Sequence, residues 1–491
     1  MTYVMSAKDM SEEEIALAVF LQGLINRGER RLFLDVDNYL EYAPQQHQRC
    51  NVWEALAEYV GLFDGLAVYD LRDGDVAVNL AATVCAAGNC LGVPRALLEK
   101  VRVIVGALPV LFDAADVGGS DAERQRAVWL QYRDKLRKDS LVHQVTEGHY
   151  HIQLRDQAIA NRVFTFFVRP ERDEGFLDEV LDWADRIIPV YGWTTDEIAF
   201  VKKLSQFGDY IVPADWSHNH SYTATDTFTP VKQRCKDEKL VADEKKHYLA
   251  IVVSDGDNVQ WFERDFSTDS HYGQRRKAPV RYKMSWTAPP LLSKICPAAL
   301  KKIYGAAEAD TFICGVSGIG YTNCMTFPRA LLSAYAEATA EGMKNADMRV
   351  LALLDNVANT KEGNAEDRLA EFAKHEQIAG GIWQLDPDRY ESGKGKIWFV
   401  NGKPFVSVGI SMWHPSCSRE GVTEEWLDGI AAAINARPID IRSENGYTVL
   451  NVHPWSTDMQ MLDHVVSRLA EHVEIVSAGE LIDMIGENVR K

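Results

Sequence analysis

The chain has 491 residues, of which 46% are hydrophobic and 25% are charged, with a formal net charge of −18. This length exceeds what one hydrophobic core usually organises, so the sequence predicts a globular protein of roughly two or three domains. The excess of negative charge argues against nucleic acid and anionic membranes as partners, because both bind basic surfaces.

The N-terminal segment 1–29 carries acidic residues where a secretory signal would carry basic ones, and its apolar residues are spaced as in an amphipathic helix. No stretch of the chain approaches the run of about eighteen apolar residues that a membrane span needs. The eight cysteines are scattered without a C-x-x-C pair, which is typical of reduced thiols. We therefore expect a cytoplasmic protein.

The first half of the chain alternates predicted helices and strands. The strands are expected in "RRLFLDVD" and "GLAVYDL". This alternation predicts an N-terminal α/β domain over 1–222, followed by a polar stretch, 223–247, that lacks an apolar period and predicts a linker. The helices are expected near 11–27, 51–61, 76–93, 121–137 and 174–188.

The second half contains eight short runs rich in apolar and β-branched residues, most of them separated by predicted helices. Continuous apolar strands that alternate with helices are typical of a parallel sheet covered on both faces. The pattern predicts a (β/α)7–8 barrel-like domain over 248–491, interrupted by a tight hairpin at Asn401-Gly402. The runs are 248–254, 281–286, 311–317, 349–355, 380–386, 404–410, 447–453 and 473–478.

Polar and aromatic residues follow these predicted strands. Barrel enzymes build their sites from the residues just beyond the carboxyl ends of the strands, where groups from separated parts of the chain meet. We therefore expect a pocket at this rim. The residues predicted there are Asp255, Asp257, Asn258, Trp286, Thr287, Gly318, Gly320, Tyr321, Asp355, Asn356, Asp386, Ser411, Trp413, His414, His453, Trp455 and Ser456.

Several of these segments resemble the GxGYxYP-motif putative glycoside hydrolase family. The resemblance is carried by "VVSDGDNVQW" (252–261), "GVSGIGY" (315–321), "LLDN" (353–356) and "YTVLNVHPWS" (447–456), with weaker matches in "LQGLINR" (21–27) and "ADWSHNHS" (214–221). The Gly-x-Gly-Tyr-x-Tyr-Pro motif that gives the family its name is matched only as far as Tyr321. Pro328 stands four residues later than in the motif, and Phe327 occupies the position of its second tyrosine. The resemblance implies a glycoside-hydrolase-like barrel behind an N-terminal α/β region.

Asp255 and Asp257 form the strongest candidate catalytic pair. Glycoside hydrolysis generally uses one carboxyl group to protonate the leaving oxygen and another as nucleophile or base. We expect Asp257 to face the substrate and Asp355 to be its partner, with Asp386 as a further candidate. Alternatively, Asp255, Asp257 and Asn258 bind a divalent cation or simply form a turn, and Asp355 and Asp386 cap helices.

His453 is predicted to be a proton shuttle, a donor to a sugar hydroxyl or a metal ligand, and alternatively a strand-end histidine bound to a backbone carbonyl. His218 and His220 are expected at the surface. Exposed aromatic rings stack on sugars, although most tryptophans belong to cores. The predicted substrate-binding residues are Asn258, Trp286, Gly320, Tyr321, Asp386, Trp413, His414 and Trp455.

Three functions fit these observations, all with a carbohydrate as partner. The first is a glycoside hydrolase that uses carboxylate general acid/base chemistry. The second is a metal-dependent deacetylase-like hydrolase, whose superfamily the aspartate pair and His453 resemble in outline, but its His-x-x-x-His motif is missing after "KMSWTAPP". The third is a non-catalytic carbohydrate-binding protein, suggested by the altered "GIGYTNCMTFP".

Overall fold

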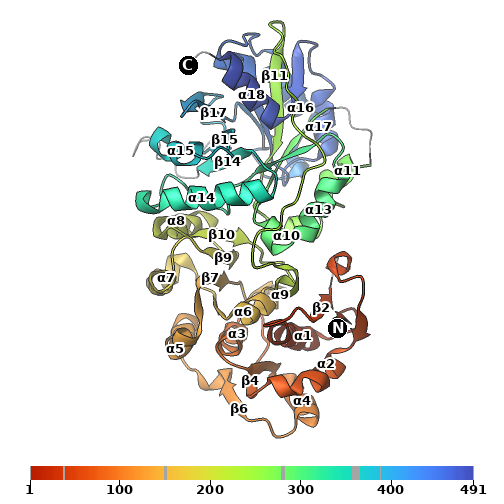
Figure 1. Cartoon of the computed structure of the whole chain (residues 1–491), viewed down its shortest axis with the longest axis vertical. Helices are drawn as coiled ribbons and strands as arrows, with labels where there is room; N and C mark the ends of the chain where they lie inside the picture. The colour runs from red at the N-terminus through yellow and green to blue at the C-terminus, as the bar shows by residue number, and fades with distance from the viewer. Residues whose placement is uncertain are drawn as a thin grey trace. The chain divides into compact units, whose positions relative to one another are not determined.

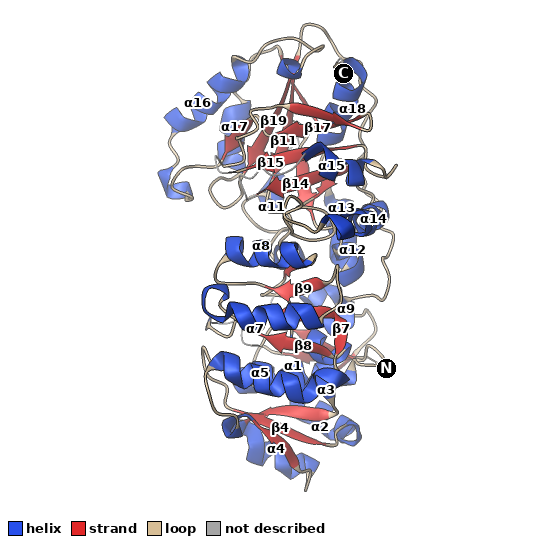
Figure 2. Ribbon diagram, turned by 90° about the vertical axis from the view of Figure 1, so that its left-hand side faces the viewer, coloured by secondary structure: helices blue, strands red, loops and turns tan. Residues whose placement is uncertain are grey.

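The computed structural model describes residues 2–36, 39–148, 152–277, 282–355, 365–386 and 389–489. The chain divides into two compact units, Met1–Thr225 and Asp226–Lys491 (Figure 1). Each unit is a mixed α/β structure in which helices alternate with strands that are mostly parallel (Figure 2). The α/β class predicted from the sequence is therefore confirmed. Within the described residues, no helix combines the length and the apolar composition that crossing a membrane would need.

The first unit contains small parallel sheets with the strand orders β2-β1-β3, β5-β4-β6 and β10-β9-β7-β8. The strands are β1 (Tyr3–Ser6), β2 (Leu32–Asp35), β3 (Gln48–Cys50), β4 (Gly65–Tyr69), β5 (Cys90–Pro94), β6 (Val110–Asp113), β7 (Arg137–His143), β8 (Val163–Phe166), β9 (Pro189–Gly192) and β10 (Tyr210–Pro213). The helices are α1 (Glu12–Ile25), α2 (Val52–Tyr59), α3 (Ala77–Ala87), α4 (Leu98–Val105), α5 (Asp121–Tyr132), α6 (Arg155–Asn161), α7 (Pro170–Trp183), α8 (Glu197–Phe207) and α9 (His220–Thr223).

The predicted helix 76–93 was wrong in its second half. The helix α3 ends at Ala87, Gly88 donates its N–H to the carbonyl of Val84, and Cys90–Pro94 forms the strand β5. Every residue of α3 and of β5 is buried. A continuous apolar run has no hydrophobic periodicity. The apolar pattern therefore cannot show where a buried helix ends and a buried strand begins.

The segments "LQGLINR" and "ADWSHNHS" meet in the interior of the first unit. The side chain of Gln22 donates to Asn219 Oδ1 at 2.6 Å, and that of Asn26 donates to Ser221 Oγ at 3.0 Å. His218 and His220 are only 4% and 1% exposed, so the expectation that they lie at the surface was wrong. Buried polar groups need partners. Gln22, Asn26, Asn219 and Ser221 therefore form a hydrogen-bonded polar core.

The second unit is organised by one curled sheet, with the order β16-β17-β15-β14-β13-β12-β11-β19-β18. All neighbours are parallel except the pair β16 and β17. The strands are β11 (His247–Val253), β12 (Ser285–Ala288), β13 (Thr311–Cys314), β14 (Val350–Asp355), β15 (Gly380–Leu385), β16 (Ile397–Val400), β17 (Lys403–Ser407), β18 (Ile410–Met412), β19 (Tyr447–Val452) and β20 (Val473–Val476). The helices include α10 (Val259–Glu263), α11 (Tyr272–Arg275), α12 (Leu292–Ile295), α13 (Pro297–Ala306), α14 (Arg329–Asn345), α15 (Ala365–Ala373), α16 (Glu424–Asn435), α17 (Met459–Val466) and α18 (Ala478–Asn488).

In the strand order of the sheet, β17 lies near one end and β18 at the other, yet the two follow one another in the chain. The sheet must therefore curl so that these two strands come together. Val408 donates its N–H to the carbonyl of Trp383 in β15, and Gly409 donates to Val449 in β19. One stretch, 403–412, thus pairs with β15 through its first half and with β19 through its second half. The sequence predicted a single strand over 404–410, and the structure divides it where the chain changes partner.

The predicted hairpin at Asn401-Gly402 and the last predicted strand, 473–478, both fall within this sheet. Asn401 and Gly402 have φ values of 50° and 80° and join the antiparallel strands β16 and β17, which confirms the tight hairpin. The last apolar run forms β20, which pairs only with His247–Ala250 in the amino half of β11. That run is therefore a short strand beside β11, off the main strand order of the curled sheet.

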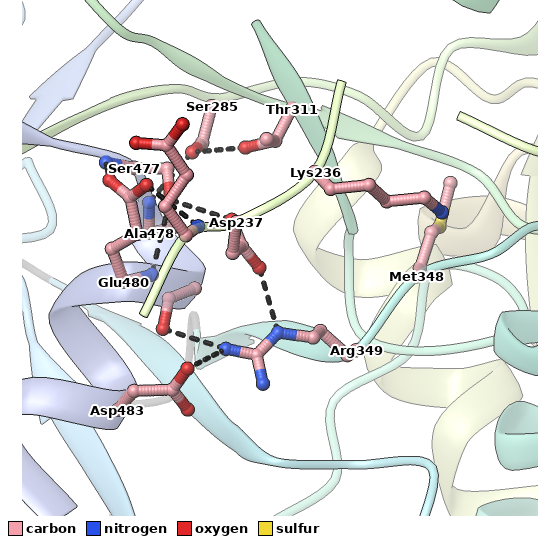
Figure 3. A network of polar contacts seen from close by, with 12 residues as sticks. Lys236, Asp237, Ser285, Thr311, Met348, Arg349, Ser477, Ala478, Glu480 and Asp483 are labelled. Atoms are coloured by element: carbon pink, nitrogen blue, oxygen red, sulfur yellow. Dashed lines mark hydrogen bonds and ion pairs between the residues drawn. The ribbon is translucent and has the colours of Figure 1, made fainter. Parts of the chain in front are cut away.

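The polar stretch after residue 225 runs along the second unit. Val231 donates its N–H to the carbonyl of Asn345, and Asp237 contacts the guanidinium group of Arg349 at 2.7 Å. Figure 3 shows Arg349 between Asp237 and Asp483, which accepts from it at 2.5 Å. Polar contacts thus attach the stretch to the second unit, together with the buried Val231, and such contacts do not require an apolar period in the sequence.

Candidate active site

A tight turn follows β11 and carries both candidate aspartates. Gly256 donates its N–H to Oγ1 of Thr287 at 2.9 Å, and this hydroxyl donates to the carbonyl of Val253 at 2.7 Å. A Cβ atom on Gly256 would lie 1.9 Å from the carbonyl oxygen of Thr287, so only glycine fits. Asp255 adopts φ 63°, a conformation that aspartate tolerates better than most residues. The turn therefore places Asp255 and Asp257 beyond the end of the strand.

Asp255 and His453 come together at the ends of neighbouring strands. Val253 of β11 pairs with Val452 of β19, so the residues that follow these strands lie side by side. The Nε2 atom of His453 lies 3.3 Å from Oδ2 of Asp255, and the two side chains are 8% and 15% exposed. On its other side, Nδ1 of His453 lies 3.1 Å from Oγ of Ser456. Two predicted site residues from opposite ends of the second unit's sequence thus share one contact.

The ring of Trp413 covers the imidazole of His453. The two rings are stacked with centroids 4.0 Å apart and an interplanar angle of 5°. The ring of Tyr390 also packs against Trp413, with a centroid distance of 5.0 Å. Burial lowers the pKa of His453 to about 4, and the nearby His271 acts in the same direction. His453 is therefore neutral near pH 7.

A buried neutral histidine makes the stability of the protein fall in acid. The unfolded chain binds a proton near pH 6.5 while folded His453 resists it until about pH 4, so the free energy of unfolding falls as the pH drops through this window. The pKa values of His453 in the unfolded and folded states differ by about 2.5, so its contribution to the fall in unfolding free energy reaches about 3 kcal/mol. Chemical unfolding of the wild type and of His453→Gln between pH 7.5 and pH 4 measures it. Equal pH dependence in both proteins would contradict the prediction.

Asp355 lies at the end of β14 in a second polar cluster. It is 1% exposed, and its Oδ1 accepts a hydrogen bond from Nδ2 of Asn323 at 3.2 Å. Asp386 follows β15 and donates its backbone N–H to the carbonyl of Asp355 at 3.2 Å. Asp355 and Asp386 therefore lie at the ends of neighbouring strands. Asn356, also predicted at this rim, lies outside the described residues.

The segment "GVSGIGY" after β13 is buried and tied to α14. The hydroxyl of Tyr335 donates to the carbonyl of Gly320 at 2.8 Å, and Ile319 donates its N–H to Oγ1 of Thr339 at 3.1 Å. Tyr321 is 3% exposed and Gly320 is also buried. The structure therefore places both predicted substrate contacts inside the loop that joins β13 to α14, where they shape the loop.

We expect Gly318→Ala to destabilise the second unit. Gly318 has φ 124°, and a Cβ atom there would lie 2.6 Å from Oγ1 of Thr339. A residue with a side chain pays about 1 to 3 kcal/mol for such a backbone conformation, and the contact adds to it. The melting temperature of the variant, compared with that of Gly305→Ala, measures the effect, because a Cβ atom at Gly305 meets nothing within 4 Å. Equal melting temperatures would show that the loop tolerates a side chain.

The predicted aromatic contacts differ in exposure. Trp286 is 1% exposed within β12 and packs edge-on against Phe266 and Tyr272, at 5.3 and 5.4 Å. Its ring belongs to the core and offers no face to a ligand. Trp455 is 47% exposed and lies 5.2 Å from Trp261. Of these two rings, that of Trp455 is exposed and that of Trp286 is not.

Two further predicted residues flank these groups. Asn258 precedes α10, and its Nδ2 donates to the carbonyl of Asp255 at 3.1 Å, so it stabilises the turn that carries the aspartates. His414 follows β18, where its Nδ1 lies 2.7 Å from Oγ of Ser416 and its ring packs edge-on against Trp426. His414 also donates its backbone N–H to Oγ of Ser456 at 3.3 Å.

Sequence reasoning missed Glu391. Its carboxylate accepts the backbone N–H of Ser411 in β18, and its backbone forms a bridge with Leu385 at the end of β15. The carboxylate thus lies at the same strand ends as the predicted residues. Glu391 stands six positions after the end of β15, so a search limited to the residues directly after each strand does not find it.

A metal site is not apparent from the side chains that the structure describes, since no three His, Cys, Asp or Glu residues in those ranges are grouped so that they could hold an ion. The set predicted as cation ligands, Asp255, Asp257 and Asn258, contains two carboxylates and one amide. Asp255 contacts His453, and its backbone carbonyl accepts from the side chain of Asn258.

Residues 245–486 match the family model described as "GxGYxYP putative glycoside hydrolase C-terminal domain", and residues 139–225 match "GxGYxYP third domain". A solved structure described as "Crystal structure of a putative hydrolase from Bacteroides thetaiotaomicron VPI-5482 at 1.25 A resolution" is similar to this chain, with a TM-score of 0.85 and 22% identity over 99% of this chain and 94% of that chain. This likeness shows a shared fold. A second structure, described as "crystal structure of SsGBP and GDP complex", matches 79% of this chain and 94% of that chain with 11% identity and a TM-score of 0.17, which supports no argument. No curated protein matches.

Proposed function

The chain belongs to the GxGYxYP putative glycoside hydrolase family, and we propose that it hydrolyses glycosidic bonds of a carbohydrate by carboxylate general acid/base chemistry at the strand ends of the curled sheet. The observation that supports this most is the turn after β11, which carries Asp257 and holds Asp255 3.3 Å from His453. The two carboxyl groups of this turn differ, because Asp255 contacts a histidine and Asp257 is only 7% exposed. Glycoside hydrolysis needs such a difference, because one group must give a proton while the other stays ionised.

The architecture in this proposal is a (β/α) barrel of seven principal strands within the catalytic domain 248–491. It is supported by the stretch 403–412, which pairs with β15 at one end of the sheet and with β19 at the other. The short β20 is an addition beside β11. In barrels of this kind the sites lie at the carboxyl ends of the strands, which is where Asp255 and His453 lie.

The proposed roles keep the sequence assignment for Asp257, which is 7% exposed, and take that of Asp255 from its contact with His453. Asp257 meets the sugar and acts on the glycosidic oxygen or on the anomeric carbon. Asp255 is held by His453 and supports the turn, and Asp355 is the partner carboxylate. One carboxyl group protonates the leaving oxygen, and the other attacks the anomeric carbon or removes a proton from the water that attacks it.

Sugar binding in this proposal uses the polar and aromatic groups around these carboxylates. The exposed face of Trp455 stacks on a sugar ring, because such faces combine apolar area with a polar edge. Trp413, Asn258, His414 and Asp386 supply the remaining contacts.

The test is a screen of the full chain against fluorogenic glycosides and against oligosaccharides and polysaccharides, followed by release of reducing ends. Cleavage of any glycosidic bond supports the proposal. Binding without cleavage, measured by calorimetry, would favour a non-catalytic carbohydrate-binding protein. Release of acetate from acetylated sugars without bond cleavage would favour a deacetylase-like hydrolase. Either of the last two results would overturn the proposed function.

A further inference from the structure

We propose that Ser456 is a positioning residue that fixes His453 as the neutral tautomer with its proton on Nε2, so that the imidazole N–H is directed at the carboxylate of Asp255. The three side chains form a line in which Oγ of Ser456 lies 3.1 Å from Nδ1 and Oδ2 of Asp255 lies 3.3 Å from Nε2. The catalytic consequence rests on the proposed function, whereas the tautomer is a property of the unliganded protein.

The tautomer follows from the chemistry at the two ring nitrogens. A neutral imidazole carries one N–H and one lone pair. If the proton were on Nδ1, the lone pair of Nε2 would face the acceptor oxygen of Asp255 at 3.3 Å, and the two would repel each other. With the proton on Nε2, this contact becomes attractive. Nδ1 then accepts a hydrogen bond.

Ser456 is placed to donate that hydrogen bond. It is fully buried, and its Oγ already accepts the backbone N–H of His414 at 3.3 Å, so its own proton remains for Nδ1 of His453. The turn around it is fixed, because Ser456 donates its N–H to the carbonyl of His453 at 3.3 Å, and Oγ1 of Thr457 donates to the same carbonyl at 2.8 Å. The hydroxyl therefore meets the ring in one geometry.

The remaining surroundings of His453 keep the ring neutral and oriented. Trp413 stacks on it at 4.0 Å and removes one face from water. The titratable groups beside it are Asp255 and His271, and the guanidinium group of Arg419 contacts His271 at 3.3 Å and the carbonyl of Pro454 at 3.2 Å. Burial lowers the pKa of His453 to about 4, which is consistent with a ring that carries a single proton near pH 7.

The proposal can be tested by two-bond ¹H–¹⁵N correlation NMR on the full chain labelled with [¹⁵N]histidine, in which His453→Gln identifies the signals of His453 among the 13 histidines. At pH 7 we expect His453 to show a protonated Nε2 and a bare Nδ1. Ser456→Ala should add signals of the Nδ1–H tautomer, because only the contact with Asp255 then opposes it, and Ser456→Thr, which keeps the hydroxyl, should restore the single pattern. A protonated Nδ1 in the wild type, or an unchanged pattern in Ser456→Ala, would overturn the inference.

Thr457→Val is the matched control, because it removes from the same turn a hydroxyl that donates to the backbone carbonyl of His453 rather than to its ring. This variant should keep the wild-type tautomer even if its stability falls. If Ser456→Ala does not fold, the wild-type spectrum still decides which nitrogen carries the proton. A protein with the Nε2–H tautomer that cleaves no glycoside would refute the proposed function and leave this inference intact. Cleavage of a glycoside by a protein whose His453 carries its proton on Nδ1 would support the proposed function and refute this inference.

Discussion

Replacing Asp257 by asparagine is expected to lower the turnover of a cleavable glycoside by about 10²- to 10⁴-fold, the range that a general acid or base contributes. The side chain keeps its size and loses only its charge and its ability to exchange a proton. Asp257 follows Gly256, whose contacts with Thr287 hold the turn through the backbone. The melting temperature should therefore change little while kcat collapses. Both quantities are measured on the same preparation, with the best substrate from the glycoside screen.

Asp255→Asn and Asp243→Asn complete this experiment. Asp255 contacts His453, so its replacement should also lower the free energy of unfolding, by about 1 to 3 kcal/mol if a buried donor loses its partner. Asp243 is exposed and caps a turn by accepting the N–H of Lys245, which asparagine also does, so Asp243→Asn should match the wild type. Full turnover in a folded Asp257→Asn would remove this residue from the mechanism. Full turnover in Asp255→Asn as well would reduce the segment to a turn.

Much of the second unit's sheet could be predicted because its strands are buried on both faces. The runs that became β11, β14, β15 and β19 match the structure within one or two residues, since each is a continuous apolar segment between polar ones. The same property hid the boundary between α3 and β5, where helix and strand are equally apolar. It also hid the division of 403–412, because a change of strand partner alters the hydrogen bonds and leaves the residue types unchanged.

The candidate site could be predicted as a set of strand ends, but the orientation of each side chain could not. Asp255 and His453 meet because their strands are neighbours, whereas the sequence predicted only that both residues lie at the same rim. Trp286 was predicted at the end of a strand over 281–286, but the strand β12 spans Ser285–Ala288, so Trp286 lies within it and its ring packs in the core against Phe266. Glu391 reaches the site from a loop, through a contact with Ser411 that depends on how the chain folds back. Residue spacing carries no signal for such contacts.

Removing the carboxylate of Asp310 is expected to lower the free energy of unfolding of the second unit by about 3 to 5 kcal/mol, the cost of leaving one partner of a buried ion pair alone. Asp310 precedes β13 and binds Arg275 of α11, with Nε 2.8 Å from Oδ1 and 2.6 Å from Oδ2. The two side chains are 4% and 6% exposed. Burial acts to lower the pKa of Arg275, and the hydrogen bonds and charge of Asp310 outweigh it, so the pKa is raised. Without Asp310 this burial acts unopposed, but an arginine side chain is effectively always protonated near pH 7, so Arg275 keeps its charge when its partner is removed.

Three variants measured by denaturant unfolding separate the loss of the pair from the loss of a surface charge. Asp310→Ala leaves the guanidinium group of Arg275 buried beside the carbonyl of Tyr282, which it contacts at 2.5 Å but which cannot neutralise it. The double variant Arg275→Met with Asp310→Leu replaces both charges by apolar groups and should be more stable than Asp310→Ala, because no buried charge remains. Glu244→Ala breaks an exposed pair with Arg442, in which the side chains are 70% and 61% exposed, and should cost less than about 1 kcal/mol. If Asp310→Ala were no more destabilising than Glu244→Ala, the buried pair would contribute no more than a surface one, and the attachment of α11 to β13 would have to come from the aromatic contacts of Tyr272 with Phe312 instead.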